Sequence, residues 1–173
     1  MSQPPLYTYS VPTFIGGLNT LSHILKKAEE YAKEKGIPLA EFVDARLYED
    51  MKPLSFQVQT VSNTAKNSLV RVAGTEPVPM EDNETTFEEL QTRITRTIEV
   101  LKAADASLFA GKEDADVTFK VGQYERHYKG QAYITDFALP NFYFHLNMAY
   151  AILRNKGVPI GKVDYLTSFN EQK

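Results

Sequence analysis

The 173 residues of this chain, of which 43% are hydrophobic and 24% charged, are enough for one globular domain over residues 1–173 with a sizeable core. Its net charge of −3 comes from intermixed acidic and basic residues, which excludes the basic surface of nucleic-acid-binding proteins, and the lack of cysteine excludes disulfides, thiolate metal sites and a cysteine nucleophile. Because no apolar run has the length of a membrane span and the N-terminal residues lack a signal-peptide pattern, we expect a cytoplasmic protein that binds no membrane.

Apolar residues at helical spacing predict a first helix over about residues 11–35, ended by Gly36 and Pro38. Its apolar stripe consists of Phe14, Leu18, Leu21, Leu25, Ala28 and Ala32. Residues 41–50 predict one short helical turn and then a loop. A second helix is predicted over about residues 51–73, with Asp50 as its N-cap and Pro53 in its first turn.

A capping box formed by Thr86 and Glu89 predicts the start of a third helix, which ends before Gly111. Between residues 114 and 128 the pattern changes to an alternation of apolar and polar residues around Gly122, which predicts a short β-hairpin. A lone hairpin is only marginally stable, so we expect it to lie against the helices.

The fourth predicted helix runs from about Gly130 to Asn155, with Gly157 as the residue after its C-cap and a bend at Pro140. The tail over residues 158–173 lacks periodicity. We expect it to run extended over the surface, with residues 167–173 disordered. The sequence therefore predicts a mainly all-α fold, an up-down four-helix bundle with a short β-hairpin before the last helix.

The fourth helix carries the main candidate for a functional site. At 100° per residue, His145 and Asn141 fall within the arc of the apolar residues and are expected to point into the bundle interior, one turn apart. A buried imidazole needs partners for both ring nitrogens, and Asn141 is the nearest in sequence. His145 would act as an acid/base group, a hydrogen-bond anchor or a metal ligand. The alternative is a structural histidine that bonds to a neighbouring helix.

Four other residues are candidates for ligand binding. Gln57 flanks the apolar stripe of the second helix and would either reach His145 or face solvent. Asp44 and Arg46 would either form an internal ion pair near the bundle mouth or lie in a solvated loop. Tyr143 would supply a phenol to a pocket or pack with its hydroxyl in water.

The remaining histidines favour surface roles. His23 lies opposite the apolar stripe of the first helix, and His127 lies in the second strand of the hairpin between charged and aromatic neighbours. A metal site made of three histidines would require both to meet His145, and the position of His23 argues against this.

Several segments also resemble a known family. They are residues 9–14, 44–47, 50–51, 53–54, 57–59, 84–87, 137–145, 149–150, 152–154, 157–162 and 164–166, of which the run from Phe137 to Arg154 is the most specific. In these segments the chain resembles a bacterial and fungal domain family of unknown function within the DinB/YfiT-like superfamily of four-helix bundles.

The resemblance implies an up-down bundle that is often a homodimer. Many members of the superfamily hold a divalent metal with one histidine on the second helix and a His-x-x-x-His pair on the fourth. In this chain the pair is Asn141 and His145, and the second-helix position corresponds to Gln57. Because amide oxygens are weak ligands for transition metals, we expect no cofactor, and any metal would have to use these three residues.

Three functions remain open from the sequence. The first is a metal-free small-molecule site, either binding or acid/base, centred on His145. The second is a structural or interaction dimer without a catalytic site. The third is a metal-dependent hydrolase or transferase like the histidine-bearing relatives. The sequence does not decide whether the protein is an enzyme.

Overall fold

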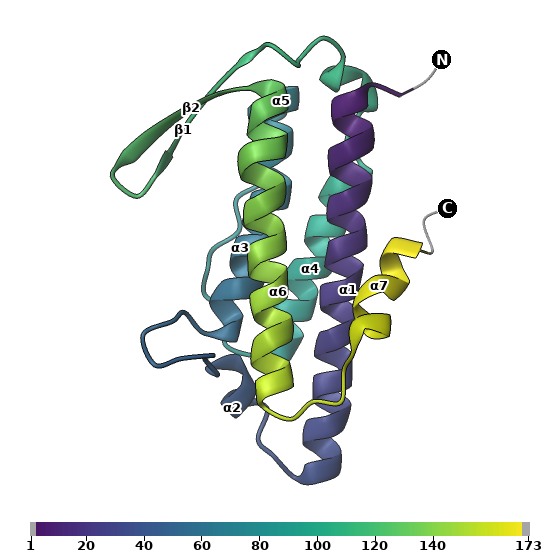
Figure 1. Ribbon diagram of the computed structural model, residues 1–173, viewed down its shortest axis with the longest axis vertical. Helices are drawn as coiled ribbons and strands as arrows, with labels where there is room; N and C mark the ends of the chain where they lie inside the picture. Colours follow the sequence, from purple (N-terminus) through teal and green to yellow (C-terminus); the bar gives the residue numbers. More distant parts are fainter. Residues whose placement is uncertain (1–2, 171–173) are drawn as a thin grey trace.

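The computed structural model describes residues 3–170, and four long helices lying side by side form its body (Figure 1). These are α1 (Pro5–Lys35), α3 (Leu54–Ser68), α4 (Phe87–Lys102) and α6 (Leu139–Asn155). Their apolar faces meet in a single core to which every one of these helices contributes residues shielded from solvent. The mainly helical bundle predicted from the sequence is confirmed.

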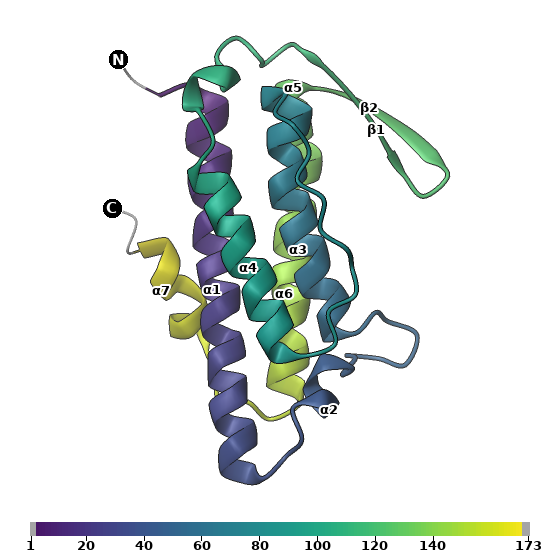
Figure 2. The ribbon, with the colours of Figure 1, turned by 180° about the vertical axis from the view of Figure 1, so that it is seen from behind.

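One connection departs from simple alternation of helix direction. Residues 74–86 return along α3, so that α3 and α4 run in the same direction (Figure 2). Hydrogen bonds at successive levels support this path, because Asn63 bonds to Asp82 at 3.0 Å and Gln59, one turn earlier in α3, bonds to Glu84 at 3.0 Å. Such a crossover needs a long linker, and this one carries the Thr86 capping box at its end.

The start of α4 has the predicted capping box. The Glu89 backbone N–H donates to the Thr86 hydroxyl at 3.2 Å, and the Thr86 N–H donates to the Glu89 carboxylate at 3.0 Å. The start of α3 differs from the prediction, because its N-cap is Pro53 without a side-chain cap and Asp50 lies outside the helix. The loop before α3 is closed instead by the Leu54 N–H, which donates to the Ala45 carbonyl at 2.9 Å.

The other helical boundaries follow the sequence with local differences. The first helix begins at Pro5, earlier than residue 11, and ends as predicted at Gly36, whose φ of 66° is left-handed. The short turn predicted within residues 41–50 is α2 (Ala40–Val43). A 3₁₀ turn, η2 (Ala106–Phe109), follows α4.

The predicted hairpin consists of β1 (Asp116–Val121) and β2 (Tyr124–Lys129). The strands are antiparallel, and Phe119 lies opposite Arg126. Figure 1 shows the hairpin leaning outward from the top of the bundle. Its base is anchored by Phe119, which is 9% exposed and packs against the rings of Tyr133 and Phe137.

Two helices contain π-helical turns that the sequence did not reveal. The segment η1 (Leu69–Ala73) extends α3, and η3 (Tyr133–Ala138) connects α5 (Gly130–Ala132) with α6. Pro140 lies in the first turn of α6, directly after η3. The missing N–H of Pro140 removes one bond of the helical pattern, and the wider π turn precedes it directly. The bend expected at Pro140 stays a prediction.

The prediction for the tail was wrong over residues 162–170. They form α7 (Lys162–Asn170), which lies against α1 (Figure 2). Asp164 holds it there by accepting hydrogen bonds from the Lys27 ammonium at 2.8 Å and from the Gly161 N–H at 2.8 Å. The bond from Lys27, opposed by desolvation, lowers the pKa of Asp164 to about 2. Residues 167–170, expected to be disordered, belong to this helix, and residues 171–173 lie outside the described part of the chain.

Between residues 3 and 170, no helix combines the length and the apolar character needed to cross a membrane.

Candidate functional site at the seam of α3 and α6

His145 lies at the edge of the buried face of α6, where that helix contacts α3. The most buried positions of α6 include Phe142 and Leu146, and three residues of α-helix place His145 about 60° from Phe142. The prediction that His145 lies well inside the arc of the apolar residues is therefore wrong, and both His145 and Asn141 are half-buried. That prediction rested partly on Ile134, which lies in η3, where the wider turn shifts the angular position of each residue.

A chain of two hydrogen bonds orients the imidazole of His145. Gln57, which is 3% exposed, donates from its amide nitrogen to the Lys52 carbonyl at 3.0 Å. This bond turns the amide oxygen of Gln57 toward Nδ1 of His145, at 2.7 Å. Because an amide oxygen only accepts, Nδ1 must carry the proton. In the neutral ring, Nε2 therefore keeps its lone pair.

Nε2 of His145 is unpaired in the described part of the chain, and two aromatic rings adjoin the imidazole. Nε2 has no hydrogen-bond partner among residues 3–170, and it is not one of the buried unpaired atoms in that part of the chain, so it reaches solvent. The rings of Phe56 and Phe144 stand edge-on to the imidazole, with centroids at 5.8 and 5.2 Å. Desolvation by burial lowers the pKa of His145, which favours the neutral ring.

Asn141 makes a separate contact one turn away. Its amide nitrogen donates to the Thr64 hydroxyl at 2.8 Å. Asn141, the candidate partner nearest to His145 in sequence, does not bond to it, because each residue bonds across the seam to α3. The site is therefore a row of two polar pairs, His145 with Gln57 and Asn141 with Thr64. The same bonds would hold a purely structural histidine, so the unpaired Nε2 is what distinguishes a functional site.

The other predicted ligand-binding residues do not join this row. Asp44 and Arg46 are exposed, and no ion pair joins them in the part of the chain that the structure describes. Arg46 instead donates to the Met51 carbonyl and closes its own loop. Tyr143 lies on the α7 side of α6, where its ring packs against Phe169, and burial raises its pKa.

The three histidines lie apart and do not form a metal site. His23 is half-buried rather than fully exposed and bonds to Asp164 at 3.2 Å, whereas His127 lies on the exposed hairpin beside Glu125, as expected. Among residues 3–170 there is no group of three His, Cys, Asp or Glu side chains placed to hold a metal ion. The donor set of the resembling metal-bearing proteins does not fit here, because the Gln57 oxygen is already bonded to Nδ1 of His145.

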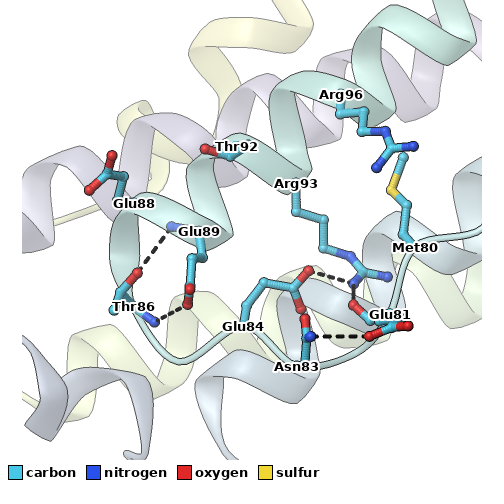
Figure 3. A pocket seen from close by; sticks show the side chains of 10 residues that line it. All are labelled: Met80, Glu81, Asn83, Glu84, Thr86, Glu88, Glu89, Thr92, Arg93 and Arg96. Atoms are coloured by element: carbon cyan, nitrogen blue, oxygen red, sulfur yellow. Dashed lines mark hydrogen bonds and ion pairs between the residues drawn. The ribbon is translucent and has the colours of Figure 1, made fainter.

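Sequence reasoning missed the buried charged residues, of which Arg93, 3% exposed, is the more deeply buried and Lys66, 8% exposed, is the other among residues 3–170. The side chain of Arg93 lies beside an open hollow of about 590 Å³ formed by α4 and the preceding linker (Figure 3). The guanidinium pairs with Asp82 at 2.7 Å and Glu84 at 2.8 Å, and it also donates to the Asn63 amide oxygen at 2.9 Å. The helical spacing of Arg93 from Leu90 and Thr97 was the available signal. The ion pairs fasten the crossover linker to the bundle, so Arg93 has a structural role.

Known proteins with the same architecture define the class of this one. A crystal structure of a DinB family member protein from Shewanella denitrificans matches with a TM-score of 0.84 and 34% sequence identity, over 93% of this chain and 91% of that chain. The fold is thus that of a DinB-like four-helix bundle.

A family model described as a domain of unknown function, DUF1993, matches residues 6–166. The chain belongs to this family, which confirms the resemblance found in the sequence. A comparison with curated proteins gave no match.

Proposed function

We propose that the seam between α3 and α6 binds a small molecule through Nε2 of His145, which accepts a hydrogen bond or a proton from it. The observation that carries this proposal is the fixed protonation of the ring. Gln57 accepts from Nδ1–H, and the opposite nitrogen is left with a lone pair and access to solvent.

The setting of His145 suits a base or acceptor near neutral pH. Its pKa is lowered by desolvation, so the imidazole is largely neutral above its ordinary value of 6.5. A base of this kind accepts a proton only when the ligand brings it within hydrogen-bond reach of Nε2. The rings of Phe56 and Phe144 beside His145 favour an aromatic ligand with a hydroxyl donor.

Phenol and its methyl ether, anisole, provide a matched pair of probes. We expect phenol to shift the Nε2 resonance of His145 and the backbone amides around residues 57 and 145 in a saturable way, and anisole to shift them much less. His145→Gln should abolish the difference between the two probes while the protein stays folded. Equal shifts from both probes, or a large loss of stability in His145→Gln without any phenol binding, would assign His145 a structural role.

The exposed ring of Phe144 supports a second candidate, a contact surface for another copy of the chain. Phe144 is 55% exposed on α6 and adjoins His145. A homodimer formed there would cover the seam. Light scattering should then give twice the monomer mass for the native protein and the monomer mass for Phe144→Ser. A monomeric native protein would exclude this candidate and leave the first untouched.

A further inference from the structure

A second hollow lies under the hairpin, at the other end of the polar row. It has a volume of about 130 Å³ and opens to solvent between α3, the hairpin and the start of α6. Its lining residues are Asn63, Thr64, Asn67, Arg71, Phe119, Val121, Phe137 and Asn141. His145 is not among them, so binding in this hollow is independent of the function proposed for His145.

Both π-helical segments of the described chain meet at this hollow. Arg71 comes from η1, and Phe137 comes from η3. A hydrogen bond of 3.1 Å from the Arg71 guanidinium to the Tyr133 hydroxyl links the two segments. Insertions of this kind re-aim side chains and occur frequently at functional sites. Here they aim one cation and one aromatic ring into the same space.

Arg71 presents a guanidinium whose charge is not neutralised locally. Its Cζ lies over the ring of Phe119, 4.0 Å from the centroid, and it has no carboxylate partner among residues 3–170. No acidic residue of the described chain lines the hollow, and Asp82, which bonds to the lining residue Asn63, is already paired with Arg93 at 2.7 Å. The hollow therefore has a positive end.

The other polar groups of the lining add donors. The amide nitrogen of Asn67 has no acceptor within the described chain, since only its oxygen is bonded, to Lys66 at 3.3 Å. The Thr64 hydroxyl accepts from Asn141 and keeps its own proton for another partner. Arg126, opposite Phe119 in the hairpin, places a second cation on the same face of the strands. The hollow is therefore lined by hydrogen-bond donors, the Arg71 cation and the rings of Phe119 and Phe137.

We propose that this hollow binds a small planar carboxylate. The carboxylate would accept hydrogen bonds from Arg71, Asn67 and Thr64, and its flat body would lie against the contiguous aromatic wall formed by Phe119 and Phe137, whose ring centroids are 4.8 Å apart. The volume of about 130 Å³ equals roughly four water molecules at ~30 Å³ each, below the range of drug-sized sites, which limits the ligand to one ring or less.

Benzoate is the probe, and benzamide is its neutral counterpart of nearly equal shape. We expect benzoate to give saturable amide shifts at residues 63–71, 119–121 and 137–141, with a millimolar Kd that is typical of so small a ligand. Benzamide should bind at least about tenfold more weakly, because it cannot pair with the guanidinium charge. Arg71→Gln should weaken the binding of benzoate by a similar factor and leave the binding of benzamide nearly unchanged.

Lys120→Gln is the matched control, since Lys120 lies on the same hairpin, points to the opposite face from Phe119 and is exposed. It should leave benzoate binding unchanged, as should His145→Gln. If Arg71→Gln does not fold, Asn67→Leu, which removes a donor at a half-buried surface position, replaces it. No saturable shift with benzoate, shifts confined to other basic residues, or equal binding of benzamide would overturn the proposal.

Discussion

Two polar side chains of this bundle are held by partners from another element. Gln57 of α3 orients His145 of α6, and the linker carboxylates Asp82 and Glu84 surround Arg93 of α4. Burial costs the two groups different amounts of free energy. The neutral pair of His145 and Gln57 loses little when it is shielded from water, whereas the buried charge of Arg93 must be compensated by its carboxylate partners. At the scale of single residues, the two sites therefore make different predictions.

The lowered pKa of His145 makes stability depend on pH. The unfolded chain binds a proton at the ordinary pKa and the folded chain only at a lower one, so stability is lost as the pH falls from about 7.5 through the folded pKa. His145→Gln removes this group. We expect its melting temperature to fall less than that of the native protein between about pH 7.5 and about pH 5. Parallel curves for the two proteins would show that the pKa of His145 is not lowered by folding.

Arg93→Met should destabilise the protein strongly, because it leaves Glu84 and the Asn63 oxygen without their buried partner. The side chain of Arg93 is 1% exposed, and breaking such a pair costs about 3 kcal/mol in the free energy of unfolding. Urea denaturation measures the loss. Arg96→Met is the control, because Arg96 lies three residues further along α4 and is exposed. This substitution should change the free energy of unfolding by less than about 0.5 kcal/mol. Similar losses in both variants would contradict the account of Arg93.

At the scale of elements, the spacing of apolar residues was enough to predict the four long helices. The change from helical spacing to alternation was enough to predict the hairpin. The sequence could not show the π turns, since they depend on how η1 and η3 meet across Arg71 and Tyr133. The same holds for α7, whose helical form is stabilised by docking through Asp164 onto α1 rather than by its own weak pattern. Local propensity yields to tertiary contacts in each case.

Gly17 sets the distance between α1 and α6. A Cβ atom at this position would lie 2.3 Å from Cε1 and 2.6 Å from Cζ of Phe142. Gly17→Ala should therefore lower the free energy of unfolding by about 1–3 kcal/mol, even though alanine favours the helix. Phe142→Leu in the same chain makes room for the alanine and should recover part of the loss. The double variant should therefore lose less free energy of unfolding than the sum of the losses in the two single variants. Additive losses would mean that the helices do not touch there.

At the scale of the whole molecule, the fold determines which predicted site residues can meet. The crossover linker leaves α3 beside α6, which brings Gln57 to His145 as the sequence suggested. The phase of His145 was misjudged because η3 shifts the start of its helix, and the packing of Tyr143 against Phe169 was hidden because the sequence did not reveal α7. Asp44 and Arg46 lie in an exposed loop, where residue type alone cannot separate a site from solvent.

The central claim is that Gln57 holds His145 with its proton on Nδ1 and its lone pair on Nε2. Nitrogen-15 NMR of the histidine side chains across a pH series tests it most directly. The account predicts a neutral His145 with a protonated Nδ1 and a pKa below 6.5. Gln57→Glu should raise that pKa, because a carboxylate stabilises the imidazolium. A protonated Nε2 in the neutral ring, or a pKa at or above 6.5 in the native protein, would contradict the claim.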